Sequence, residues 1–143
     1  MRIAAAASSI IKNSVPVRFL TWNLRYDAIP DSIPLSTTLD SLPTTIPADD
    51  EVQFYQPPHE QPWSTRRVSV ARDILFGAPA IICVQEALSR QVQDLATLLG
   101  DEYSWVGVGR EDGKISGEFE AVFFQVGVVE IIEWDTVWFA HPS

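Results

Sequence analysis

The sequence has 143 residues, of which 46% are hydrophobic and 20% are charged, and its formal net charge is −9 at pH 7. This length and composition are typical of a single globular domain and exclude a wholly disordered chain. The acidic charge provides no general attraction to nucleic acid or to anionic membranes, and no apolar run is long enough to span a bilayer.

The N-terminal part of the chain combines a leader, a strand and a proline-rich segment. Residues 1–16 hold a short Ala-rich run that serines interrupt, so we interpret them as a disordered leader. They show no clear secretory signal, which favours an intracellular location. The apolar run Val17–Trp22 predicts a buried strand that ends at Asn23. The segment from Ala28 to Pro62 contains seven prolines without a regular period. It predicts a disordered insertion, with a functional loop as the alternative.

A helix is predicted to follow this segment. Ser64 or Thr65 is expected to cap it, and it continues to Phe76, where Gly77 and Pro79 end it. The helical spacing of its apolar residues predicts a buried face made of Val68, Ala71, Ile74 and Leu75.

A central strand and a second helix come next. The continuous apolar run Ala80–Val84 predicts a strand buried on both faces, which leads directly into Glu86. Cys83, the only cysteine, lies in this run and is interpreted as a buried core thiol that forms no disulfide. Ser89 is expected to cap the second helix and Gly100 to end it. Its predicted buried face consists of Val92, Leu95, Ala96 and Leu99.

The remainder of the chain has the pattern of strands. Tyr103–Val108 predicts one strand, Phe119–Phe124 the next, and Val128–Phe139 one or two more. Together with the earlier elements, this order predicts a mixed α/β fold with at least one right-handed crossover.

Two polar residues follow apolar strands and are candidates for chemistry. Asn23 and Glu86 each stand at the carboxyl end of a predicted strand, where ligands gather in open α/β sheets. A carboxylate held there is a suitable ligand for Mg²⁺, and an Asn beside it could orient a phosphate oxygen or a metal-bound water. The alternatives are a solvated Glu86 and a turn residue at Asn23.

The glycine-rich segment Gly107–Glu118 is the second candidate. Its composition, with Asp112-Gly113 as a turn signal, predicts a hairpin connection rather than a phosphate-binding loop of the nucleotide type. Either it is a plain surface hairpin, or Arg110 and Glu118 point from its base toward a site, with Arg110 facing phosphate. Neither histidine stands at a strand end beside a carboxylate, and no zinc or Ser-His-Asp pattern occurs.

Taken in order, these segments resemble the endonuclease/exonuclease/phosphatase superfamily, in its subgroup of uncharacterised hydrolase-like proteins. The resemblance covers Val17 to about Trp138 except for the proline-rich insertion. It is carried by the motifs TWNLRYD at 21–27, PWSTRR at 62–67, IICVQE at 81–86, Gln91 with Leu95, and YSWVGVGREDG at 103–113 followed by GEF at 117–119.

The resemblance implies a fold and an activity. The fold is a DNase I-like two-sheet α/β sandwich, and the activity is magnesium-dependent phosphodiesterase or phosphatase chemistry, with Mn²⁺ as a possible substitute. Glu86 would bind the metal, and Asn23 would contact the metal or the scissile phosphate. Glu118 would brace a catalytic histidine, and Arg110 would line the pocket for a phosphate-ester substrate of unknown class.

The sequence also departs from the family pattern. GEF is followed here by EAVFF instead of SPIFY, and the residues after Trp138 differ from the usual continuation. No Asp-x-Asn motif occurs, and neither do the central catalytic histidine and terminal Asp-His pair of the family. We therefore expect an N-terminal portion whose C-terminal half is missing and which is inactive alone. The alternative is a non-catalytic truncated pseudoenzyme, or an incomplete gene model, with at most a binding role. An uncovered sheet face would favour self-association.

Overall fold

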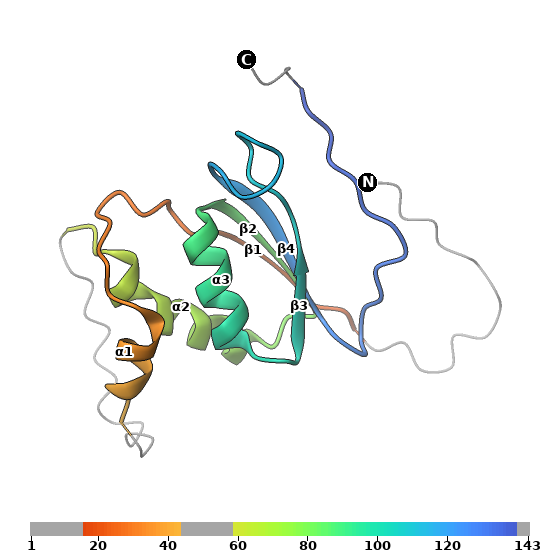
Figure 1. Cartoon of the computed structure of the whole chain (residues 1–143). Helices are drawn as coiled ribbons and strands as arrows, with labels where there is room; N and C mark the ends of the chain where they lie inside the picture. The colour runs from red at the N-terminus through yellow and green to blue at the C-terminus, as the bar shows by residue number, and fades with distance from the viewer. Residues whose placement is uncertain (1–15, 44–58, 140–143) are drawn as a thin grey trace.

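A computed structural model describes residues 16–43 and 59–139. Its elements are β1 Phe19–Asn23, α1 Leu35–Asp40, α2 Trp63–Gly77, β2 Ile81–Ala87, α3 Ser89–Leu99, β3 Tyr103–Val106 and β4 Phe119–Gln125 (Figure 1). The expected leader, apart from Pro16, and residues 44–58 of the insertion lie outside the described residues. None of the described helices is long and apolar enough to cross a membrane.

The four strands form one mixed sheet in the order β1-β2-β4-β3. β1 runs parallel to β2, whereas β4 is antiparallel to both of its neighbours. The parallel pair requires a crossover, and α2 lies within that connection. The mixed α/β fold predicted from the sequence is therefore confirmed, with β1 to β4 close to the four strands predicted up to Phe124.

One face of the sheet carries the hydrophobic core. Figure 1 shows α2 and α3 on the same side of the sheet. The strand side chains beneath them, Ile82, Val84, Ala121 and Phe123, are at most 1% exposed and are therefore full core residues. The helices contribute Trp63, Ala71, Ile74, Val92, Leu95 and Leu99.

The opposite face is less covered. Phe19, Ile81 and Phe124 stand in one row across β1, β2 and β4, because they are register partners. Phe19 is 69% exposed, and Ile81 and Phe124 are only partly buried. Cys83 lies on this face and is also partly exposed, so its interpretation as a buried core thiol is wrong. The prediction that this central strand is buried on both faces is therefore wrong. β2 is fully buried on one face only, because the described helices cover a single side of the sheet.

The strands expected within Val128–Phe139 are absent from the described structure. After a turn in which the Val128 and Val129 N–H groups donate to the Gln125 carbonyl, residues 130–139 have irregular conformation. Ile132 is 90% exposed, so its side chain packs on nothing. An apolar pattern forms a strand only where another strand pairs with it, and these residues pair with neither edge of the sheet.

The proline-rich segment is more ordered than expected in its described part. It contains α1, and the carbonyls of Ile33 and Pro34 accept hydrogen bonds from Arg67 at 3.3 and 2.8 Å. Arg67 is completely buried and also pairs with Asp94 at 2.9 Å. Residues 28–43 are therefore fixed by α2 through polar contacts, which an apolar periodicity cannot reveal.

The expected N-terminal helix caps are also wrong, whereas Gly100 ends α3 as predicted. α2 begins one residue before Ser64, and the Ser64 hydroxyl bonds to Asp31 instead of the helix backbone. α3 begins at Ser89 itself, and the side chain of Gln91 accepts the Leu88 N–H at 2.9 Å. In α2 the buried face is centred on Ala71 and Ile74 as expected, but Leu75 is 43% exposed and points outward.

Candidate metal site

The two predicted strand-end residues meet at the carboxyl ends of β1 and β2. The Asn23 side chain donates a hydrogen bond of 2.7 Å from Nδ2 to Oε1 of Glu86. The strands bring them together because β1 and β2 are parallel and Asn23 is the register partner of Gln85. The Glu86 side chain is 35% exposed, so its carboxylate is both anchored and accessible.

The backbone at Glu86 is irregular. The register between β2 and β4 shifts between Val84 and Ala87, and Glu86 has a φ of 58°. A bulge of this kind places an extra residue in one strand and redirects its side chain. A left-handed conformation is unfavourable for a residue with a Cβ atom, and such conformations concentrate at functional sites.

The turn after β1 is held by four hydrogen bonds with three side chains. Arg25 also has a left-handed conformation, with a φ of 59°. Its N–H donates to Oδ1 of Asn23 at 2.8 Å, and its carbonyl accepts from Gln91 at 3.0 Å and from Arg66 at 3.3 Å. Arg66 additionally donates to the Leu24 carbonyl at 2.7 Å. The motifs TWNLRYD, PWSTRR and the first turn of α3 therefore converge on this one turn.

A partly buried ion network supports the same region from the helix side. Arg90 lies 3.9 Å from Asp27 and 3.1 Å from Asp31. Asp94, which pairs with Arg67, also accepts the indole N–H of Trp63 at 2.9 Å. Hydrogen bonds from Ser64, Ile33 and Arg90 lower the pKa of Asp31, although its partial burial acts to raise the pKa. Asp31 is therefore ionised over the physiological range and binds the proline-rich segment to α3.

The hairpin residues Arg110 and Glu118 contact each other. Nη1 of Arg110 lies 2.6 Å from Oε2 of Glu118, and the Arg110 N–H donates to the Glu118 carbonyl at 3.1 Å. The hairpin predicted by Asp112-Gly113 is present. The Asp112 carboxylate accepts the N–H groups of Lys114, Ile115 and Ser116, which lowers its pKa. The predicted roles of Arg110 in substrate binding and of Glu118 beside a histidine stay predictions.

Glu120 is a third acidic residue near Glu86, and the sequence assigned it no role. The residue is exposed, and its pKa is raised first by reduced hydration of the carboxylate and then by the negative charges of Glu118 and Glu86. The available signal was the spacing of two glutamates, Glu118 just before β4 and Glu120 within it. These three carboxylates give the end of the sheet a local excess of negative charge.

The donor set at Glu86 fits magnesium in part. Among residues 16–43 and 59–139, no group of three or more His, Cys, Asp or Glu side chains is arranged to hold a metal ion. Magnesium usually takes only one or two protein carboxylates and completes its octahedron with water and substrate phosphate oxygens. Glu86 fits this requirement. The Asn23 amide oxygen accepts the Arg25 N–H, so in this arrangement Asn23 orients Glu86 through its nitrogen.

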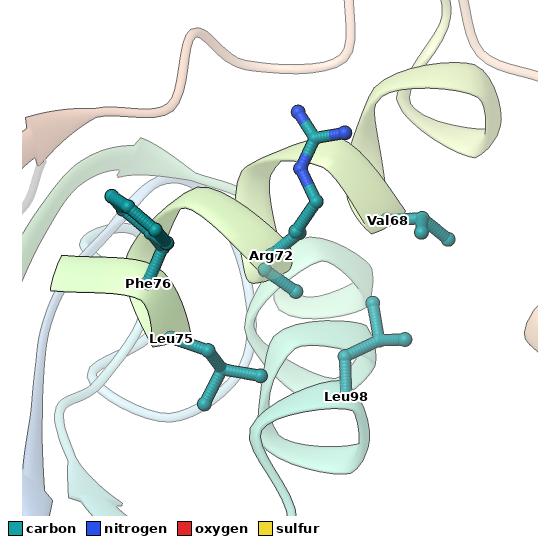
Figure 2. A pocket seen from close by; sticks show the side chains of 6 residues that line it. Val68, Arg72, Leu75, Phe76 and Leu98 are labelled. Carbon is teal, nitrogen blue, oxygen red and sulfur yellow. The ribbon is translucent and has the colours of Figure 1, made fainter. Parts of the chain in front are cut away.

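One hollow in the described part of the chain lies apart from this site. It is a shallow groove of about 400 Å³ on the outer side of α2, lined by Val68, Ala71, Arg72, Leu75, Phe76 and Leu98. Figure 2 shows Leu75 of α2 and Leu98 of α3 on opposite sides of it. The groove contains no carboxylate that could bind a metal, so it does not belong to the Glu86 site.

Comparison with known proteins agrees with the mixed α/β fold described above. An endonuclease/exonuclease/phosphatase from Bacteroides vulgatus is similar at 30% identity and a TM-score of 0.52, over 77% of this chain and 31% of that chain. A family protein from Bacteroides thetaiotaomicron matches at 25% identity and a TM-score of 0.57, over 82% of this chain and 32% of that one.

A mannosyl-6-phosphatase from Bacteroides thetaiotaomicron has the same fold, with 24% identity, a TM-score of 0.57, and coverage of 82% of this chain and 34% of its own. No protein-family model and no curated protein matches the sequence. The chain spans about a third of the length of the structures it matches. The predicted resemblance to an N-terminal portion of the endonuclease/exonuclease/phosphatase superfamily, with its DNase I-like fold, is thereby confirmed.

Proposed function

We propose that this chain forms the Glu86-bearing part of a magnesium-dependent phosphoester hydrolase. The observation that carries the proposal is the hydrogen bond from Asn23 to Glu86, which presents one exposed carboxylate at the carboxyl end of a parallel strand pair. Similarity to endonuclease/exonuclease/phosphatase proteins supports the reaction class. A magnesium ion held by Glu86 would polarise a phosphoryl oxygen of the substrate.

The residues around Glu86 would prepare the site for the ion. Asn23 fixes the direction of the carboxylate, and the bulge in β2 projects it beyond the sheet. Glu120 and Glu118 add negative charge that attracts a divalent cation. Either a phosphodiester or a phosphomonoester fits this chemistry, and the net charge of −9 disfavours long nucleic acids as substrates.

Hydrolysis requires a group that activates water, and we propose that the 143 residues do not supply it. His59 is exposed at the edge of the described segment before α2, and His141 lies outside the described residues. The chain alone would therefore bind magnesium without turning over substrate. The second candidate function is a non-catalytic binding protein. A metal site without a water-activating group favours this function for the isolated chain.

A magnesium titration of the purified chain tests the proposal. Calorimetry should detect a weak site that Glu86→Gln removes and that Glu133→Gln, an exposed carboxylate distant in sequence, leaves intact. Magnesium should also lower the raised pKa of Glu120, as followed by carboxyl NMR, because the ion offsets the neighbouring negative charges. Equal magnesium affinity of the native and Glu86→Gln chains would refute the metal assignment.

The inactivity proposal has its own assay. With magnesium and bis(p-nitrophenyl) phosphate or p-nitrophenyl phosphate, we expect no release of nitrophenol above the rate without protein. Turnover that disappears in Glu86→Ala would show that the chain contains a complete catalytic site.

A further inference from the structure

We infer that Arg25 is the residue at this site that binds the phosphate group of a ligand, an inference that deepens the proposed function and rests on it for the identity of the reaction. The Arg25 guanidinium lies 3.9 Å from Oε2 of Glu86, on the carboxylate oxygen that Asn23 does not use. A cation and a metal-binding carboxylate thus stand together at the ends of β1 and β2.

The other arginines near the site are already committed to protein partners. Arg66 donates three hydrogen bonds to backbone carbonyls, the closest at 2.7 Å. Arg90 binds the Asp31 backbone and side chain, and Arg110 lies 2.6 Å from Glu118. Such short, oriented contacts would have to break before these side chains could bind a ligand. These contacts hold the loops around the site in place.

Arg25 is different because its ion pairs are longer; Arg110 is also exposed, but its ion pair with Glu118 is short. Its side chain is 52% exposed, and its contacts are ion pairs at 3.3 Å with Glu60 and 3.9 Å with Glu86. The guanidinium also lies over the Tyr26 ring, 4.5 Å from the ring centroid. Stacking on an aromatic ring orients a planar guanidinium without using its N–H donors. Those donors therefore remain available to an incoming anion.

The backbone at Arg25 indicates that its position is imposed by the surrounding structure. A left-handed conformation favours Gly or Asn, yet a large charged residue occupies it. The bonds from Asn23, Gln91 and Arg66 hold this conformation and thereby direct the side chain toward Glu86. An unfavourable conformation that three separate groups maintain is typical of binding sites.

The chemistry of the guanidinium selects the ligand. Its planar fork of N–H donors matches two oxygens of a phosphate group, which a lysine ammonium cannot do. Glu60 competes for the same donors, because its carboxylate lies 3.3 Å from Nε of Arg25. Removing the Glu60 charge should therefore strengthen phosphate binding, whereas removing the Arg25 charge should weaken it.

The test is a titration of the 143-residue chain with inorganic phosphate, with and without magnesium, followed by ³¹P NMR. Arg25→Gln should weaken phosphate binding by about tenfold or more, the usual effect of losing charge-assisted hydrogen bonds. Arg25→Lys should recover only part of the affinity, and Glu60→Gln should bind several-fold more tightly. Arg72→Gln is the matched control: this exposed arginine lies on α2 beside Asp73, and its loss should change nothing.

The outcomes separate the two proposals. Absence of phosphate binding by the native chain, or equal binding by the native and Arg25→Gln chains, overturns the assignment of Arg25. If Arg25→Gln fails to fold, as judged by circular dichroism, Glu60→Gln decides: unchanged or weaker phosphate binding overturns the assignment. If Glu86→Gln leaves magnesium affinity unchanged while the phosphate results hold, the metal proposal fails and the Arg25 site stands.

Discussion

Phe123 and Phe124 are neighbours in β4, but they meet opposite surroundings. Phe123 points toward α2 and α3 and is completely buried, whereas Phe124 points to the other face and is only partly buried. The same contrast separates Ile82 from Ile81 in β2. In the two-sheet sandwich that the family resemblance implies, a second sheet covers this other face. The described residues therefore complete one core and leave a second apolar surface in contact with water.

The largest expected effect comes from truncating the two phenylalanines. Phe123→Ala should lower the free energy of unfolding by about 3–5 kcal/mol, because it removes a ring from a packed core. Phe124→Ala should cost about 1–2 kcal/mol, because its ring buries less area. Urea unfolding of both variants measures the difference. Equal losses would mean that the two faces are equally covered.

The next-largest loss of stability is expected at Arg67, the buried charged residue of α2. Arg67→Ala should destabilise the chain by about 3 kcal/mol, because it leaves Asp94 and the carbonyls of the proline-rich segment without their buried partner. Arg72→Ala, which removes an exposed ion pair, should cost about 0.5 kcal/mol or less. Urea unfolding again provides the measurement. A small loss for Arg67→Ala would mean that residues 28–43 contribute little to the fold.

A smaller effect with a defined pH dependence is expected at Asp31. Its pKa is lowered below 3.8 in the folded state, so the ionised form is favoured there. Its stabilising contribution is complete above pH 3.8 and is lost as the pH falls through the lower folded pKa. Asp31→Asn should cost about 1 kcal/mol at pH 7. This difference should shrink in strong acid, and a difference that grows below pH 3.8 would contradict the assignment.

The smallest effect on stability is expected at the open face itself. Phe19→Lys should change the free energy of unfolding by about 0.5 kcal/mol or less, because Phe19 is already 69% exposed. It should nevertheless reduce self-association, which we predict to occur through this face. Sedimentation velocity at several concentrations tests this. A native chain that stays monomeric at high concentration would show that the open face is not adhesive.

Much of the fold was predictable because local patterns determine it. The positions of β2 and β4 and the helical spacing of Val92, Leu95 and Leu99 follow from patterns in consecutive residues. The placement of Asn23 and Glu86 at the carboxyl ends of strands was also expected, but the hydrogen bond between them was not. Features of this kind can be recognised from short stretches of sequence.

The remaining features depend on contacts between distant residues. The apolar residues from Val128 onward form no strand because no edge pairs with them. Ser64 bonds to Asp31, 33 positions earlier, instead of capping α2. Glu120 becomes significant only because the sheet brings it near Glu86, and Arg25 only because Gln91 and Arg66 fix its backbone. Such tertiary partners cannot be inferred from spacing along the chain.

The left-handed backbone at Arg25 and Glu86 has a consequence for selection experiments. Each position carries a side chain whose conformation costs on the order of 1 kcal/mol relative to glycine. A library randomised at both positions and sorted for folding alone should therefore enrich Gly and Asn. The same library sorted for phosphate or magnesium capture should return Arg at position 25 and Glu at position 86. The difference between the two populations would measure how much folding stability this chain gives up to keep a charged pair at the end of its sheet.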